Sequence, residues 1–257
     1  MEALFQDLWS TATPQLWIIA AISILLAGIL RAFTGFGFAL IAVPVLGLIF
    51  APQIAVPIVV GLEIVSGFAL LPKARIDTDW GLFRILSLAA LPTLPIGIWL
   101  LQILDDDTMR LLLSGILLLS VALFGIGAKA KGSGQPPGPT PTAATGLASG
   151  LMAGVSGIPG PPIVAYLMGT GLPPERQRAT LIAYFIVVDA GAFLGFALTG
   201  NVTATTALAV ALMVPAMLIG NKLGALAFRH FGTAAWQPVA GGLLFIIAAG
   251  LVARALF

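Results

Sequence analysis

Residues 16–32 read LWIIAAISILLAGILRA, an apolar run that contains a single charged residue. A helix crosses the hydrocarbon core of a bilayer with about 20 apolar residues, and runs of similar length recur along the chain. Hydrophobic residues make up 59% of the 257 positions and charged residues only 9%, whereas a soluble domain carries about 25% charged residues. The sequence therefore predicts an all-α integral membrane protein.

About ten transmembrane or re-entrant segments are predicted, in two groups of five. They cover about 16–32, 35–50, 54–72, 80–103, 108–128, 142–155, 157–171, 177–199, 204–228 and 235–256. The polar stretch between the groups is rich in glycine and proline, which is typical of a linker. We therefore divide the chain into a first five-segment unit (1–128), a linker (129–141) and a second five-segment unit (142–257).

The basic residues predict the orientation of these segments. When the ten segments are followed across the membrane, nine lysines and arginines fall on the side that holds the linker and two on the side that holds the N-terminus. Arg31 is left out of this count. The nine are Lys73, Arg75, Arg84, Lys129, Lys131, Arg176, Arg178, Lys222 and Arg229. Basic loops stay in the cytoplasm, so we expect a cytoplasmic linker, both termini outside, and a multi-pass location in the bacterial inner (plasma) membrane.

The two units resemble each other. A shift of 122 residues places Gly28 on Gly150 and Thr34 on Ser156, and a shift of 123 places Gly97 on Gly220. Because each unit has an odd number of segments, the second must be inserted upside down relative to the first. Such inverted repeats are the plan of many secondary transporters.

The first two segments of each unit are interrupted, at residues 29–37 and 154–162. Broken helices at membrane depth line cavities or lie buried in protein, and the N-terminus of a half-helix attracts anions. We therefore predict a substrate site for a small oxyanion at the breaks. Its candidate residues are Arg31, Thr34, Gly35, Gly37, Ser156, Gly157, Gly160, Pro161 and Tyr184. The alternative is that the breaks are Gly/Pro kinks that only help helices to pack.

Charged residues inside a membrane are functional candidates. Glu63 and Asp189 each lie near the middle of a predicted span, and a buried carboxylate can carry a proton, so we predict proton coupling there. The alternative is a structural carboxylate, hydrogen-bonded or paired with Arg31. Arg31 itself either binds the anion, if the first hairpin is re-entrant, or is a cytoplasmic anchor, if the first segment spans fully. For Tyr184 the alternative is aromatic packing.

An enzyme is disfavoured because the chain has no cysteine, one histidine and no catalytic constellation. We predict no catalytic residue, no cofactor, no metal and no nucleic-acid partner. The acidic run Asp105-Asp106-Asp107 is interpreted as an exposed turn, with a calcium site as the alternative. No Walker-type loop is present, so the predicted energy source is a gradient or a separate subunit.

At the breaks the chain resembles the TauE/SafE family of membrane transporters, or sulfite exporters. The resemblance rests on GFGFALIAVPVL (35–46) and GVSGIPGPPIV (154–164) and on the duplicated organisation. It implies export of a small anion, such as sulfite or an organosulfonate like sulfoacetate. The predicted function is thus a secondary transporter working by alternating access, with an anion channel or a non-transporting assembly subunit as the alternatives. The predicted partners are the anion, the lipid bilayer and, in a homo-oligomer, a second copy of the chain.

Overall fold

The computed structural model describes residues 13–129 and 138–231, and within these ranges it contains helices and no strand. In chain order the helices are α2 (Pro14–Thr34), α3 (Phe38–Leu46), α4 (Pro52–Ala74), α5 (Trp80–Ala90), η1 (Leu91–Thr93), α6 (Leu94–Ile103), α7 (Asp106–Lys129), α8 (Pro139–Ser156), α9 (Gly160–Thr170), α10 (Pro174–Leu198) and α11 (Ala204–Phe231). Nine of the ten predicted segments coincide with these helices. The tenth, 235–256, lies outside the described residues.

Five helical stretches in the described ranges are long and apolar enough to cross a bilayer: α2, α4, the α5–η1–α6 run, α10 and α11. They contain 21 to 28 residues, or about 31 to 42 Å at 1.5 Å per residue. Large apolar side chains face outward from the bundle, with Leu88, Leu111 and Leu194 71%, 75% and 60% exposed. The chain is therefore a multi-pass membrane protein whose outer surface suits lipid.

The helix breaks lie where the sequence predicts them. Gly35 and Gly157 end α2 and α8 in the left-handed region, with φ of 89° and 65°, which a residue with a Cβ rarely adopts. The helices that follow, α3 and α9, have 9 and 11 residues and rise only about 14 and 17 Å. Neither half-helix can cross the membrane alone.

Two segment boundaries differ from the prediction. Helix α8 begins at Pro139, inside the stretch read as linker, because proline is well tolerated in the first turn of a helix. The fourth predicted segment is interrupted at its middle by the short 3-10 helix η1, which contains Pro92 and lies between α5 and α6. Its counterpart Pro215 stays inside α11.

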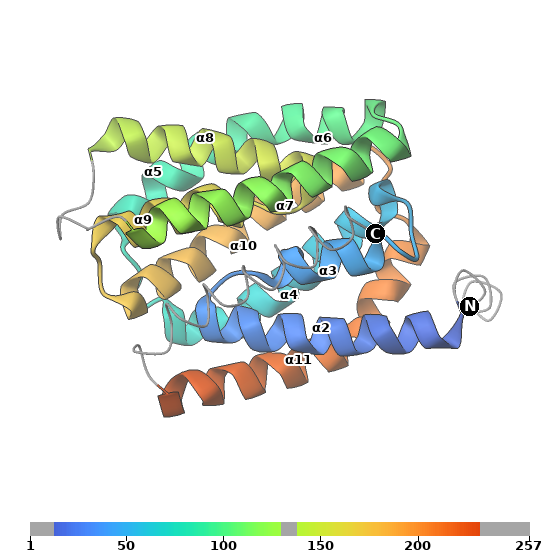
Figure 1. Ribbon diagram of the computed structural model, residues 1–257, viewed down its shortest axis with the longest axis horizontal. Helices are drawn as coiled ribbons and strands as arrows, with labels where there is room; N and C mark the ends of the chain where they lie inside the picture. Colours follow the sequence, from blue (N-terminus) through green and yellow to red (C-terminus); the bar gives the residue numbers. More distant parts are fainter. Residues whose placement is uncertain (1–12, 130–137, 232–257) are drawn as a thin grey trace.

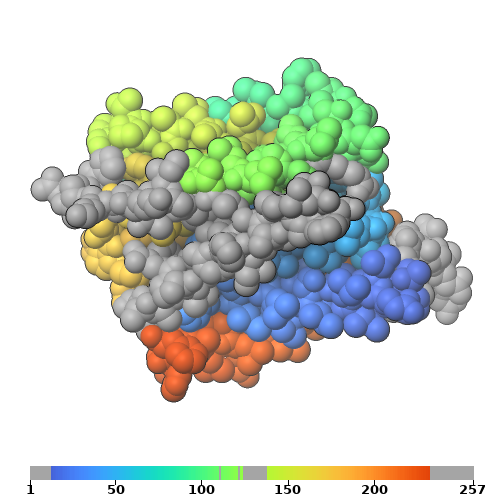
Figure 2. Space-filling view, viewed as in Figure 1, coloured from blue at the N-terminus to red at the C-terminus, as the bar shows by residue number. Residues whose placement is uncertain are grey.

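The helices form a layered bundle (Figure 1). Helices α2 and α11 lie at one edge, α6, α7 and α8 at the other, and α3, α4 and α10 between them. Helices α2 and α8 run in opposite directions in this view. Figure 2 shows the same order on the surface, with blue α2 against red α11 and yellow-green α8 beside green α6.

Packing between the halves is reciprocal. The most extensive contacts join α2 to α11, α8 to α5 and α6, and α4 to α10. The first helix of each half thus packs on the fourth segment of the other half. At both places the backbones touch: a Cβ on Gly220 would lie 2.2 Å from the Leu25 carbonyl oxygen, and one on Gly97 2.4 Å from that of Leu151. Only glycine fits at these two positions.

Candidate functional site

The two broken helices meet at one small internal cavity. It lies between the N-termini of α3 and α9 and is lined by Gly37, Ala39, Leu40, Glu63, Ile158, Pro159, Gly160 and Phe185. The volume open to the centre of a water-sized sphere is about 10 Å³, roughly the space of one water molecule. Glu63 is the twelfth residue of α4, so this cavity is near the middle of a membrane span.

An ionic cluster from three helices adjoins the cavity. Arg31 Nη1, in the last turn of α2, donates to Glu63 Oε1 of α4 at 2.7 Å, and Arg31 Nη2 is 3.8 Å from Asp189 Oδ2 of α10. The three side chains are 0%, 3% and 1% exposed. The guanidinium also lies over the ring of Phe185, 5.2 Å from its centre.

The burial of Arg31 contradicts one of its two sequence-based interpretations. Helix α2 is long enough to span the bilayer, the case in which Arg31 was expected to be a cytoplasmic anchor. That expectation is wrong, because the side chain turns inward and pairs with Glu63 at a sequence separation of 32 residues.

Several polar atoms of this cluster lack hydrogen-bond partners among the described residues. They are Arg31 Nε and Nη2, Glu63 Oε2, and both carboxylate oxygens of Asp189. Buried polar atoms without partners are rare in native structures because each costs free energy. Donors and acceptors therefore remain available here for a proton, a water or a polar ligand.

Glu63 also lies at the N-terminus of α3. Its side chain and Ala39, in the first turn of that helix, line the same cavity. The opposing N-terminus of α9 is poorer in donors, because Pro161 and Pro162 carry no N–H. The N-terminus of α3 is thus better suited to an anion than that of α9, and the side chain of Glu63 lies there.

The hydroxyl groups of the matched residues Thr34 and Ser156 form hydrogen bonds with the backbone of the breaks. Thr34 Oγ1 donates to the carbonyl oxygen of Leu30 at 2.9 Å and accepts the N–H of Phe36 at 3.2 Å. Ser156 Oγ donates to the carbonyl oxygen of Met152 at 2.6 Å and accepts the N–H of Ile158 at 3.2 Å. In this conformation both side chains hold the backbone of the break.

Tyr184 is linked to the second break through a residue that the sequence analysis missed. Its hydroxyl donates to Ser149 Oγ at 2.9 Å, and Ser149 Oγ donates to the carbonyl oxygen of Pro159 at 2.5 Å. Ser149 precedes Ser156 by seven residues and so lies on the same face of α8. That spacing is the signal by which it could have been found.

Arg178 holds the first break and was interpreted only as a topological anchor. Its Nε and Nη2 both donate to the carbonyl oxygen of Ala32, at 3.0 and 2.5 Å. The guanidinium lies over Phe228 of α11, 4.4 Å from the ring centre, and the backbone of Arg178 packs against Gly35. Nothing in the local sequence distinguishes it from its neighbour Arg176.

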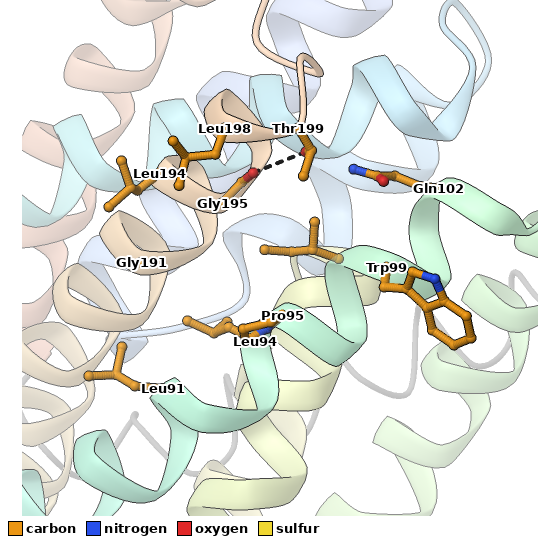
Figure 3. A pocket seen from close by; sticks show the side chains of 11 residues that line it. Leu91, Leu94, Pro95, Trp99, Gln102, Gly191, Leu194, Gly195, Leu198 and Thr199 are labelled. Carbon is orange, nitrogen blue, oxygen red and sulfur yellow. Dashed lines mark hydrogen bonds between the residues drawn. The ribbon is translucent and has the colours of Figure 1, made fainter.

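A larger groove lies elsewhere, between the α5–η1–α6 run and α10 (Figure 3), with a volume of about 460 Å³. Leucines and Trp99 line most of it, and Gln102 and Thr199 lie at one end, where Thr199 donates to the carbonyl oxygen of Gly195. No charged side chain lines this groove among the described residues. It lacks a cationic donor for an anion, so we place the candidate site at the smaller, ionic cavity.

Comparison with known proteins gives two matches. The family described as "Sulfite exporter TauE/SafE" matches residues 20–251. A protein of Cupriavidus necator, named "Probable sulfite/organosulfonate exporter TauE", is 30% identical over 231 residues, which cover 88% of this chain and 90% of that protein. No solved structure matches the chain significantly.

Proposed function

This chain belongs to the sulfite exporter TauE/SafE family, and from that membership we propose that it is a secondary transporter which exports a small anion across the bacterial inner membrane. The substrate class is sulfite or an organosulfonate, because the Cupriavidus necator relative carries both in its name. The function is transport and not catalysis, in line with the family.

The observation that carries the proposal is Arg31. It is fully buried, pairs with Glu63, which lines the cavity at the N-terminus of α3, and has two nitrogens, Nε and Nη2, without hydrogen-bond partners in the described part of the chain. Arginine binds planar and pyramidal oxyanions through two parallel hydrogen bonds. A guanidinium next to the positive end of a half-helix is a suitable receptor for such an anion.

Alternating access by two inverted five-segment units is the proposed transport cycle, with a cytoplasmic linker and both termini outside. It is supported by the matched breaks after Thr34 and Ser156 and by the reciprocal packing of α2 on α11 and of α8 on α5 and α6. Two symmetry-related halves around one central cavity give a transporter two equivalent gates.

Proton coupling is assigned to Glu63 and Asp189. Both carboxylates are buried next to one arginine, so their protonation changes the net charge of a buried site. A channel is the competing function, but the narrow cavity, about 10 Å³ in volume, favours a carrier with a closed centre.

Flux measurements in proteoliposomes test this function. We expect sulfite flux that saturates with concentration and responds to a pH gradient, and we expect Arg31→Ala to reduce it at least about tenfold, the effect of losing roughly 1.4 kcal/mol of binding. Arg176→Ala is the matched control, since Arg176 is exposed. Flux that neither saturates nor responds to the gradient would identify a channel, and full activity of Arg31→Ala would remove Arg31 from the site.

A further inference from the structure

We propose that the carboxylate of Glu63 is a built-in occupant of the anion site, which a transported anion displaces together with the uptake of one proton. The inference rests on the proposed function, because it concerns how the same site receives its substrate. It follows from the contacts of Glu63, the space around it and the charges of the cluster.

The contacts of Glu63 are those that an oxyanion needs. Its Oε1 accepts from Arg31 Nη1 at 2.7 Å, and its side chain lines one cavity with Ala39, in the first turn of α3. Charge-assisted bonds from a guanidinium are among the strong ones in anion recognition, and a helix N-terminus adds a favourable positive end. The carboxylate therefore stands in for the oxyanion of a ligand.

The space excludes an additional anion beside Glu63. The adjoining cavity has room for about one water molecule, and sulfite has four heavy atoms. Glu63 itself lines this cavity, so rotation of its side chain away from Arg31 would free the guanidinium. An anion thus takes the place of the carboxylate.

The charges of the cluster predict that binding of an anion is accompanied by uptake of one proton. Arg31 contributes +1 and the carboxylates of Glu63 and Asp189 −1 each, so the fully ionised cluster carries −1. One proton makes the resting cluster neutral, and a bound monovalent anion requires a second. Buried net charge is costly, so binding and protonation of Glu63 are linked.

No other described ionisable group takes this proton. Besides Arg31 and Asp189, the nearest ionisable side chains along the packed helices are Tyr184 of α10, which donates to Ser149, and Tyr166 of α9, which is hydrogen-bonded to Thr142. The others on these helices, Lys73 of α4 and Glu175, Arg176 and Arg178 of α10, lie ten or more residues from Glu63 or Asp189 along the same helix, about 15 Å or more. Helix α3 has no ionisable side chain. The anion and one proton thus enter and leave together, and the transport step is electroneutral.

Isothermal calorimetry on the purified full-length protein tests the inference. Methanesulfonate is the probe, because it does not titrate near neutral pH. Titrations in buffers of different ionisation enthalpy should give uptake of about one proton per anion, and the affinity should rise about tenfold for each unit that the pH falls. These two measurements need no variant. Binding without proton uptake and without this pH dependence would overturn the inference.

Two variants separate the carboxylates. Glu63→Gln should bind methanesulfonate at least about tenfold more tightly, because the competing occupant is gone. Its resting cluster of Arg31 and ionised Asp189 is already neutral, so the proton that accompanies the anion goes to Asp189 and uptake stays near one. Asp189→Asn, the matched control, should also take up one proton but without the gain in affinity, since Glu63 remains. Equal or weaker affinity in Glu63→Gln would overturn the inference while leaving the transporter intact. Absence of both binding and sulfite flux in the wild type would instead refute the proposed function, and the inference with it.

Discussion

Thr34 and Ser156, which are 122 residues apart, make the same pair of backbone contacts. Each hydroxyl donates to the carbonyl oxygen four residues earlier and accepts the N–H two residues later. Each is followed by a glycine in the left-handed region. The two helix breaks are therefore built in the same way, with a hydroxyl replacing the backbone partners that the break removes.

Thr34→Ala and Ser156→Ala should each destabilise the protein by about 1–3 kcal/mol, because a buried N–H loses the hydroxyl oxygen that accepts it. Thr34→Ser and Ser156→Thr keep the hydroxyl and should retain most of the stability. Unfolding of the purified protein in detergent measures both effects. Alanine variants as stable as the wild type would mean that the hydroxyls do not hold the breaks.

Arg178→Ala should loosen the first break, because the carbonyl oxygen of Ala32 loses both of its bonds to the guanidinium. We expect a loss of about 1–3 kcal/mol in stability and a lower sulfite flux in proteoliposomes. Arg178→Lys keeps the charge but not the forked donors, so it should be intermediate. Arg176→Ala is the control, and an equal effect of the two alanine variants would reduce Arg178 to a topological anchor.

Gly97→Ala should be strongly destabilising, because its Cβ would lie 2.4 Å from the Leu151 carbonyl oxygen and 2.8 Å from the Gly154 Cα. The free energy needed to separate the two packed backbones is several times larger than the gain in helix propensity from glycine to alanine. The control is Gly115→Ala in α7, where a Cβ meets nothing within 4 Å. That variant should gain about 0.5–1 kcal/mol. Thermal unfolding should therefore show shifts of opposite sign, and shifts of the same sign would contradict the close packing.

Asp105 provides a prediction about pH. Its Oδ1 accepts the N–H of Thr108 at 3.0 Å and its Oδ2 the Thr108 hydroxyl at 2.7 Å, and these bonds lower the pKa of the carboxyl. Its contribution to stability is then present above the unfolded-state pKa, about 3.9, and is lost as the pH falls through the lower folded-state pKa.

Asp105→Ala should accordingly lower the melting temperature at neutral pH, with a difference from the wild type that shrinks as the pH falls below about 4. Melting curves from pH 7 to pH 3 measure this trend. Asp107→Asn, an exposed neighbour without the two bonds, should show little effect at any pH. A constant difference across the range would exclude the ionised Asp105 carboxylate as its source.

The helices and the breaks could be predicted because they depend on local sequence. Apolar runs give the spans, and Gly35 and Gly157 mark where each first helix ends. The role of Arg31 could not be predicted, since its partner Glu63 is brought to it by the packing of α2 against the centre of the bundle. For the same reason Arg178, which contacts Ala32 across 146 residues, looked like one more basic residue at a helix start.

The glycine-mediated contact of α2 with α11 has a mechanical consequence. Where the two backbones are in direct contact, no side chains lie between them that could change conformation. The two helices are therefore expected to move together as one rigid body. The same holds for α8 with α6. Each pair joins a helix of one predicted unit to a helix of the other, and in each pair one helix, α2 or α8, ends at a break. Movement of either pair would therefore shift the start of the half-helix that follows the break, close to the cluster of buried charges.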